Sequence, residues 1–359
     1  MNLPSHGSNP QYVYEALKLK QPDKIVDFSV NTNPLGPPDF LKDQWGALFE
    51  LVTDYPDPLA SELRSVIADK EGLNIDQVLS GNGAAELIFL VASLFHGKKA
   101  LIVSPAFSEY EQALLSYGCE VEEYILEEKN GWQLDPPVLL KALKGKDLVV
   151  ICNPNNPTGI MYDKNHILEV ISYAKDQKTL VMIDEAFYDF AENSPTLAAE
   201  LPNYQNLIIL RSLTKMYAIA GVRLGYVLGN RDLIHKLEDR KPHWSVNSLA
   251  QQLGIRCLHE ANHVRKTQQF IKAERERVQS SLHSLSYSVL KSNVNFFLVK
   301  DLHQHRTDQL YQFLLSKGIV TRHTRNFKGL EGSHLRMAVK TREENDRMLE
   351  QMKEWRGEC

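Results

Sequence analysis

Five short apolar runs, separated by segments of helical length, are the feature that most constrains the fold of this chain. They are KALIVSP (99–105), DLVVICNP (147–154), TLVMIDEAF (179–187), NLIILRS (206–212) and RLGYVLG (223–229). Continuous apolar runs are typical of strands buried on both faces, and helices between such strands cover those faces. The pattern therefore predicts an α/β fold with a mostly parallel sheet flanked by helices.

The rest of the chain predicts a smaller α+β unit. Residues 246–285 have a helical pattern, and residues 286–340 indicate strands around a helix over 306–317, followed by a closing helix. The strand-like segments here are YSVL, VNFFLV, IVTRH and HLRMAV. The first 35 residues look too short to fold alone, so we expect them to pack on the smaller unit or to reach toward a partner. The expected domains are a large one over 36–245 and a small one formed by 1–35 and 246–359.

Composition excludes several classes of protein. The chain has 359 residues, a hydrophobic fraction of 43% and a formal net charge of -4, which argues against general nucleic-acid binding. No apolar stretch approaches membrane-spanning length, and the N-terminus lacks the pattern of a signal peptide. The four cysteines are widely spaced, which suits a reducing compartment. We expect a cytoplasmic protein that binds neither nucleic acid nor membranes.

Polar residues follow several of the predicted strands. The segment LSGNGAAELIF places Gly83 and Ala84 where a helix begins, and free N–H groups at a helix N-terminus can bind an anion. Asn156 lies in CNPNNPTG and Asp184 in IDEAF, each directly after an apolar run. The plainer interpretation is a set of turns and helix caps. Because ligands of such sheets bind beyond the carboxyl ends of the strands, we expect these residues to share one crevice.

The segment RSLTKMYAIAGVRLGY (211–226) places Lys215 in largely apolar surroundings. The plainer alternative is a surface helix with a solvated lysine. A partly desolvated lysine can instead lose its proton and form a Schiff base with an aldehyde. Ser212 and Arg223 of the same segment could hold a phosphate group.

Together these residues fit one ligand, pyridoxal 5′-phosphate. Asp184 would pair with its pyridinium nitrogen, Asn156 with its ring hydroxyl, and Lys215 with its aldehyde. Phe107, in SPAFSEY, could stack on the ring. The residues expected at the phosphate are Gly83, Ala84, Ser212 and Arg223.

The ordered motifs GNGAAE, PNNPTG, DEAF and SLTK followed by Arg223 resemble those of fold-type I pyridoxal-phosphate enzymes of the aspartate aminotransferase superfamily. The resemblance covers essentially the whole chain, including NTNPLGPP, DYPDP and LRMAV. It implies a large domain with a mostly parallel seven-stranded sheet and a smaller α+β domain. It also implies a homodimer with shared active sites, in which Tyr55 of DYPDP reaches the cofactor phosphate of the neighbouring subunit.

Within this superfamily the chain is similar to two groups, the threonine-phosphate decarboxylases of cobalamin biosynthesis and the histidinol-phosphate aminotransferases. The segments SHGSN, NGWQL and PHWSVNSLA favour the decarboxylases. The resemblance then implies decarboxylation of O-phospho-L-threonine to 1-amino-2-propanol phosphate, with transamination as the alternative. The residues implied at the substrate, with Asn156 among them, are Ser5, His6, Asn31, Arg322 and Arg336.

One position departs from the family pattern. Many members have a tyrosine three residues after the aspartate, where it donates to the ring hydroxyl, and this chain has Phe187 there with Tyr188 next to it. If the strand continues, neighbouring side chains face opposite ways, so Tyr188 does not replace the missing hydroxyl. This change puts a simple transfer of aminotransferase chemistry in doubt.

Two other classes deserve comparison. The segment HEANH matches the zinc-binding H-E-x-x-H helix, in which His259 and His263 would share one face. Its flanking residues are polar and charged, so a solvated helix is the better interpretation, and we expect no metal. A non-catalytic domain with the same fold would need an attached DNA-binding region, for which this chain has no spare residues. Lys215 favours an enzyme.

Overall fold

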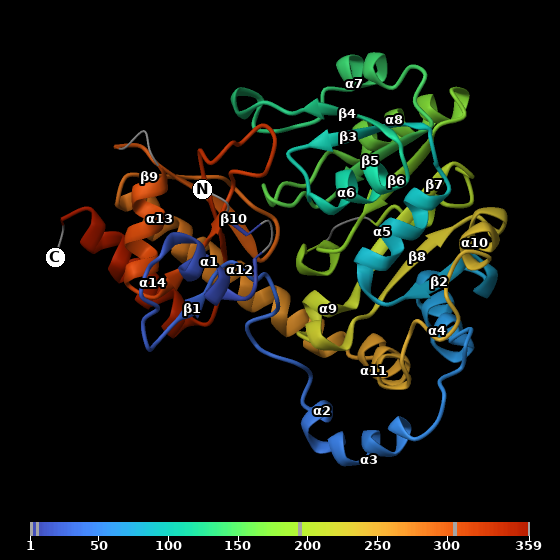
Figure 1. The fold of residues 1–359 in the computed structure, drawn as a ribbon, viewed down its shortest axis with the longest axis horizontal. Coiled ribbons are helices and arrows are strands. Elements are labelled where there is room, and N and C mark those ends of the chain that lie inside the picture. Colours follow the sequence, from blue (N-terminus) through green and yellow to red (C-terminus); the bar gives the residue numbers. More distant parts are fainter. Residues whose placement is uncertain (1–2, 5–6, 193–195, 304–306, 358–359) are drawn as a thin grey trace.

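The computed structural model describes residues 3–4, 7–192, 196–303 and 307–357. Within them the chain forms one large sheet, a smaller sheet and a two-stranded pair, with helices packed against them (Figure 1). No helix in these ranges is long and apolar enough to cross a membrane.

The large sheet has seven strands in the order β2-β8-β7-β6-β5-β3-β4. The strands are β2 (Val78–Gly81), β3 (Lys99–Ser104), β4 (Glu120–Ile125), β5 (Leu148–Cys152), β6 (Leu180–Asp184), β7 (Leu207–Ser212) and β8 (Gly225–Gly229). Strand β8 is antiparallel to both of its neighbours, and the other pairs are parallel. The predicted mostly parallel, seven-stranded sheet is confirmed. Its central strands are continuous apolar runs, which can be buried on both faces.

Helices cover both faces of this sheet, as the continuous burial of its central strands requires. Side chains such as Ile102 and Val150 pack in one cluster, whereas their neighbours Leu101 and Val149 pack in the other. The first cluster includes side chains from α5 (Gly83–Ser93), α6 (Glu109–Ser116) and α10 (Arg231–Glu238). The second includes side chains from α4 (Ser61–Glu71), α7 (Pro136–Ala142), α8 (Lys164–Asp176), α11 (Ser248–Leu258) and α12 (Ala261–Ser284).

The small sheet is antiparallel, with the order β12-β13-β10-β9. Its strands are β9 (Tyr287–Val289), β10 (Phe296–Asp301), β12 (Arg322–His323) and β13 (Leu335–Ala338). Helices α13 (Thr307–Ser316) and α14 (Arg342–Trp355) pack against it together with α12 (Figure 1). The small sheet lies beside the carboxyl ends of the parallel strands, and the crevice between them is where the site forms.

The N-terminal residues pack on the small sheet's side of the molecule, as expected. Strand β1 (Val26–Asp27) pairs in parallel with β11 (Ile319–Val320), and the Tyr14 hydroxyl of α1 (Pro10–Leu17) donates to the Leu315 carbonyl at 2.8 Å. The predicted domain boundaries stay a prediction.

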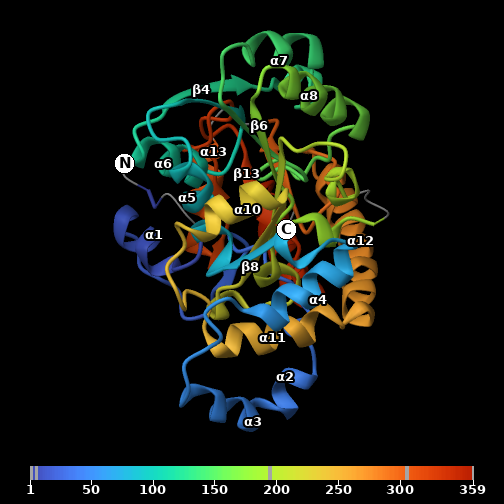
Figure 2. The same cartoon turned by 90° about the vertical axis from the view of Figure 1, so that its right-hand side faces the viewer.

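Two short helices, α2 (Phe40–Asp43) and α3 (Trp45–Phe49), lie at one end of the molecule beyond α11 (Figure 2). A 3-10 turn, η1 (Glu50–Val52), follows them. The remaining helical elements are α9 (Leu213–Met216) and the 3-10 turns η2 (Ile75–Gln77), η3 (Glu128–Asn130), η4 (Tyr188–Phe190), η5 (Ala198–Glu200) and η6 (Ala220–Val222).

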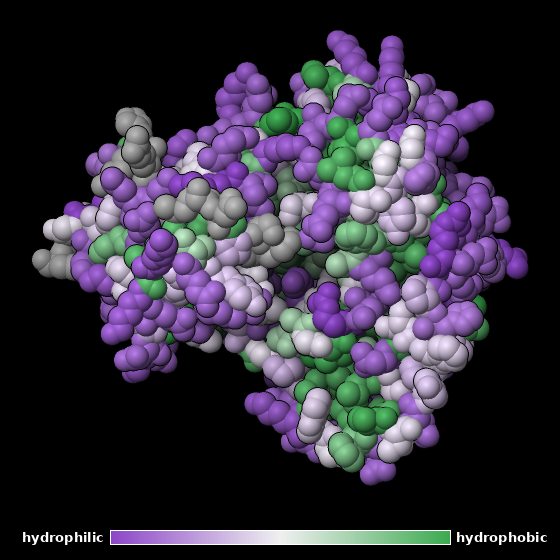
Figure 3. Space-filling model, viewed as in Figure 1, coloured by the Kyte–Doolittle hydropathy of each residue, from purple (hydrophilic) through white to green (hydrophobic). Residues whose placement is uncertain are grey.

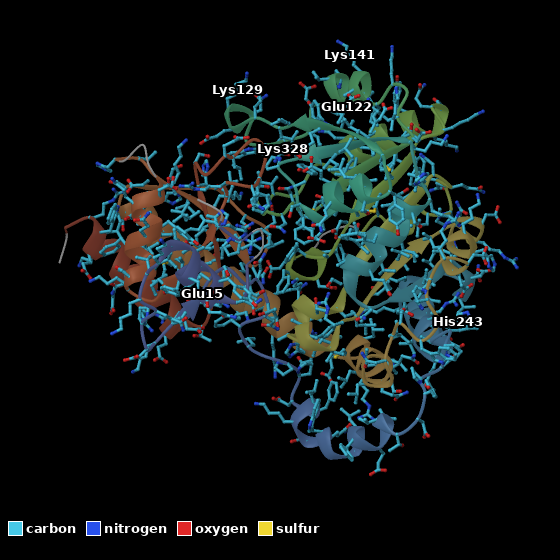
Figure 4. The ribbon with its side chains drawn as sticks, in the orientation of Figure 1. Glu15, Glu122, Lys129, Lys141, His243 and Lys328 are labelled. Carbon is cyan, nitrogen blue, oxygen red and sulfur yellow. The ribbon has the colours of Figure 1, made fainter. Side chains whose placement is uncertain are left out.

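Ion pairs connect the small sheet's side to the edge of the large sheet. Lys328 lies beside β4 (Figure 4), with its Nζ 2.7 Å from a Glu111 carboxylate oxygen and 2.5 Å from one of Glu123. Lys300 of β10 is 3.1 Å from Glu128.

Candidate active site

A cavity of about 260 Å³ lies at the carboxyl ends of β5, β6 and β7. Figure 3 shows the surface hollowed near the centre of the view, between the two groups of elements. The large sheet's side supplies Ala84, Phe107, Tyr110, Cys152, Asn156, Asp184, Phe187, Ser212, Thr214, Lys215 and Arg223. The other wall includes Gly7, Ser8, Ser29, Val30, Asn31, Arg322, Phe327 and Arg336.

Asp184 ends β6 and is 4% exposed. Its Oδ1 accepts a hydrogen bond from the Ala186 N–H at 2.8 Å, and its Oδ2 accepts one from the Tyr110 hydroxyl at 2.5 Å. Burial raises the pKa of this carboxyl to about 6, and the two hydrogen bonds oppose that rise. Asp184 is thus an acid at the cavity floor, suited to a cationic ring nitrogen.

Lys215 lies in α9, the short helix that follows β7. The Asn33 N–H donates to its carbonyl at 3.0 Å, which ties the N-terminal segment to this helix. Burial, followed by the nearby guanidinium groups of Arg336 and Arg223, lowers the pKa of the lysine to about 8. The amine therefore loses its proton more readily than that of an ordinary lysine and is better able to react with an aldehyde.

Gly83, Ala84, Ser212 and Arg223 meet at the N-terminus of α5. Gly83 has φ +81, and a Cβ at this position would lie 2.5 Å from Arg223 Nη2, so any side chain would displace the guanidinium. Arg223 itself has φ 61, a conformation that is rare outside glycine. The Ser212 and Thr214 hydroxyls are 2.9 Å apart. This gathering of donors fits a phosphate group.

Two buried arginines line the opposite wall. Arg336 donates from Nη1 to Asn156 Oδ1 at 2.6 Å and from Nη2 to the Ser29 carbonyl at 2.7 Å. Arg322 donates to the His323 carbonyl at 2.7 Å and to Asn326 Oδ1 at 2.6 Å. Burial, followed by the nearby charge of Arg322, lowers the pKa of Arg336 to about 9. Two neighbouring cations in such a wall favour an anionic ligand.

Phe187 lines the cavity and packs edge-on against Phe296 at 4.9 Å between ring centroids. The segment does not continue as a strand past Phe187, because β6 ends at Asp184 and Tyr188 begins η4. The Tyr188 ring lies under the Arg211 guanidinium at 4.2 Å. It therefore still supplies no hydroxyl in place of the missing one.

Most of the predicted site residues that the structure describes line this cavity, and Gly83 lies next to it against Arg223. Tyr55 is 86% exposed, with its ring 5.6 Å from that of Trp244, so it does not line the cavity of its own chain. Ser5 and His6 lie outside the described residues. Asn31 lines the cavity and is 5% exposed.

Sequence reasoning missed several lining residues, chiefly Tyr110, Cys152 and Thr214. Tyr110 lies three residues after Phe107, a spacing that can bring both rings to the same side of the chain, and their centroids are 5.9 Å apart. This spacing is the sequence feature that could have predicted Tyr110 as a lining residue. Cys152 ends β5 opposite Asp184 in the sheet register, and nothing in its sequence surroundings distinguishes it from a core residue.

The HEANH segment does not form one helix. Helix α11 ends at Leu258, and α12 begins at Ala261, so the prediction that His259 and His263 share a helix face is wrong. The His263 ring stacks on that of Tyr217 at 6.1 Å. No group of three or more metal-ligating side chains was found among the described residues.

The residues present fit pyridoxal 5′-phosphate. Lys215 can bind its aldehyde, Asp184 can accept from its ring nitrogen, and Asn156, whose oxygen is taken by Arg336, keeps its amide N–H groups for the ring hydroxyl. The donors around Gly83 and Arg223 can hold its phosphate. When bound, this group supplies an electron sink for reactions at an amino-acid Cα.

Comparisons with known proteins agree with this arrangement. The chain is 32% identical over 347 residues to a threonine-phosphate decarboxylase of Salmonella typhimurium, covering 96% of this chain and 94% of that protein. It is 32% identical over 350 residues to a histidinol-phosphate aminotransferase of Methanothermobacter thermautotrophicus, covering 96% and 92%. The crystal structure of the histidinol-phosphate aminotransferase from Clostridium acetobutylicum superposes with a TM-score of 0.87 at 31% identity, covering 92% of this chain and 99% of that one.

The model of one family, aminotransferase class I and II, matches residues 23–352. Both the sequence match and the site geometry point to the same cofactor. The chain belongs to this family and is a pyridoxal-phosphate enzyme.

Proposed function

We propose that this enzyme decarboxylates O-phospho-L-threonine to 1-amino-2-propanol phosphate, a step in the biosynthesis of cobalamin. The observation that carries the proposal is the pair of buried guanidinium groups, Arg322 and Arg336, on the wall facing Lys215. Their number suits a substrate with two anionic groups, and phosphothreonine has a carboxylate and a phosphate. The name of the Salmonella relative supports the same substrate.

Substrate orientation would select the reaction. Only a bond to Cα held perpendicular to the cofactor ring overlaps its electron sink, so the residues that fix the anionic groups choose the bond that breaks. Arg336 is fixed by Asn156 and by the Ser29 carbonyl. It can therefore hold an anion in a defined direction relative to the cofactor.

Lys215 is the residue that would donate the proton to the substrate Cα. Loss of carbon dioxide leaves an electron pair at Cα, and one proton must then be delivered to that carbon. The Lys215 ammonium faces the cavity, and its lowered pKa of about 8 makes it a ready donor. The amine left behind regains a proton from water.

The test is product analysis with phosphothreonine. We expect carbon dioxide and 1-amino-2-propanol phosphate without any added 2-oxo acid, and we expect Lys215→Ala to abolish both. Strict dependence on 2-oxoglutarate or glutamate would contradict the proposal. Matched variants Arg322→Gln and Arg336→Gln should each raise the KM for phosphothreonine by about 10- to 100-fold, since each removes a charged hydrogen-bond donor.

The second candidate is a histidinol-phosphate aminotransferase. The Methanothermobacter and Clostridium proteins support it. Such an enzyme would use the same two arginines for a phosphorylated amine and a dicarboxylic amino acid in turn. Turnover of histidinol phosphate with 2-oxoglutarate, and none of phosphothreonine alone, would establish this reaction instead.

We also propose that the enzyme is a homodimer with shared sites. Tyr55 is too exposed to serve its own cavity, and it follows in the sequence the exposed apolar side chains Trp45, Phe49 and Val52 of the α2–η1 segment. A second copy covering this surface would bring Tyr55 toward the partner's cofactor phosphate.

A further inference from the structure

Tyr110 contacts Asp184, the acid expected at the cofactor's ring nitrogen, and both residues line the cavity. It lies in the first turn of α6, is 1% exposed, and its hydroxyl donates to Asp184 Oδ2 at 2.5 Å. The Ala186 N–H holds the other carboxylate oxygen. Both carboxylate oxygens therefore accept hydrogen bonds, and these bonds favour the ionised form of Asp184.

No lysine or arginine in the described parts of the chain forms an ion pair with Asp184. Burial disfavours its charge, and the neighbouring carboxylate of Glu185 disfavours it too. The hydrogen bonds from Tyr110 and Ala186 are the leading opposing influences. Because the site is buried, a single charge-assisted hydrogen bond has a large effect there.

We propose that Tyr110 is a positioning residue that keeps Asp184 ionised, so that the proton shared with the cofactor remains on the ring nitrogen. Without the hydroxyl, Asp184 becomes the stronger base and takes that proton. The ring nitrogen is then neutral, and the electron sink is weaker. The step transfers one proton from the ring nitrogen to the Asp184 carboxylate and makes or breaks no other bond.

A nearby tyrosine shows that burial alone does not require such a partner. Tyr162 is 3% exposed, and its hydroxyl has no hydrogen-bond partner within the described residues. Cys152 influences the ionisation of Tyr162 and of Tyr110, so both hydroxyls lie in the same neighbourhood. Tyr162 therefore provides a matched control, since Tyr162→Phe removes an equally buried hydroxyl without touching Asp184.

The experiment uses holoenzyme reconstituted with cofactor labelled with ¹⁵N at the ring nitrogen. In the wild type we expect a pyridinium signal at neutral pH. Tyr110→Phe should move the signal toward that of a neutral pyridine and weaken cofactor binding about tenfold, as loss of a charged hydrogen bond predicts. Asp184→Asn should give the neutral signal, and Tyr162→Phe should leave both signal and affinity unchanged.

A pyridinium signal with wild-type cofactor affinity in Tyr110→Phe would overturn the proposal. If that variant does not fold, position 110 can carry 4-aminophenylalanine, which keeps a donor, or 4-fluorophenylalanine, which has the same size and none. The first should keep the pyridinium signal and the second should lose it, and equal signals would overturn the proposal. None of these measurements depends on whether the enzyme decarboxylates or transaminates.

Discussion

Burial sets the protonation of the side chains that do the chemistry. It lowers the pKa of Lys215 to about 8, that of Arg336 to about 9 and that of Arg322 to about 10, and it raises that of Asp184 to about 6. In each case the largest cause is loss of water around a charge. The protonation state of each group therefore depends first on its burial and then on the charged side chains around it.

The pH dependence of cofactor uptake follows from Lys215. Only the neutral amine attacks an aldehyde, so uptake by the apoenzyme should rise about tenfold per pH unit up to about pH 8 and then level off. Arg336→Gln removes a positive neighbour, so the pKa of Lys215 rises and the midpoint moves to higher pH. Stopped-flow absorbance of the cofactor measures the rate.

Arg342→Gln, on the exposed surface of α14, is the control and should leave the midpoint in place. An unchanged midpoint in Arg336→Gln would contradict this account. Borohydride reduction of the holoenzyme followed by peptide mapping should place the label on Lys215, and a label elsewhere would refute the assigned site.

Some residue roles follow from the sequence and others do not. The place of Lys215, Asp184 and Asn156 in the cavity was predictable because each lies at or just after the end of an apolar run, and the carboxyl ends of parallel strands meet at one edge. The spacing from Phe107 could have placed Tyr110 near the site, but its hydrogen bond to Asp184 depends on how α6 packs on the sheet, which that spacing does not give. Strand β6 ends at Asp184, so the alternation of side chains along a strand does not decide where Tyr188 points.

At the scale of elements, a buried ion pair connects the ends of β6 and β7. Arg211 Nε lies 2.8 Å from Glu185 Oε2, with side-chain exposures of 4% and 1%. Each partner is the direct neighbour of a site residue, Glu185 of Asp184 and Arg211 of Ser212. The pair therefore fixes the relative position of the two strand ends that carry the cofactor's acid and one of its phosphate donors.

Glu185→Gln should destabilise the enzyme by about 3 kcal/mol, because it leaves the Arg211 guanidinium buried without its closest counter-charge. Urea unfolding of the apoenzyme measures the change. Lys272→Gln breaks the exposed Lys272–Glu192 pair and should change the free energy of unfolding by less than about 1 kcal/mol. Equal effects of the two variants would contradict a structural role for the buried pair.

The sequence predicted elements well where they are buried and poorly at edges. The five apolar runs all became strands of the large sheet. Strand β4 was not recognised, because it is an edge strand with three glutamates and carries no continuous apolar run. The single strand expected from IVTRH is wrong, since β11 pairs with β1 and β12 joins the small sheet, a division that depends on distant partners.

At the scale of the whole molecule, the exposed α2–η1 segment predicts assembly. Trp45 is 54% exposed, Phe49 69% and Val52 62%, which is unusual for side chains of this size unless another surface covers them. We expect a dimer in solution, and Trp45→Asp combined with Phe49→Asp should yield monomers in sedimentation velocity.

Shared sites can be tested by mixing subunits. Lys215→Ala and Tyr55→Ala homodimers should both have low activity, the second through weaker cofactor binding. If Tyr55 serves the partner's site, each mixed dimer has one intact site, and a random mixture should recover about a quarter of wild-type activity. No recovery in mixed dimers isolated by two affinity tags would show that Tyr55 acts within its own chain or not at all.

The reversed direction of β8 has a consequence for how the site assembles. Because β8 is antiparallel to β7, the chain leaves the sheet at Ser212 and re-enters it at Gly225 at the same edge. Lys215 and Arg223 lie in that connection, so the lysine expected to bind the cofactor and an arginine expected at its phosphate come from one sequence-local loop. Closing a loop this short costs little conformational entropy. The part of the site that holds the cofactor covalently can thus form early in folding, before the distant parallel strands have found their partners.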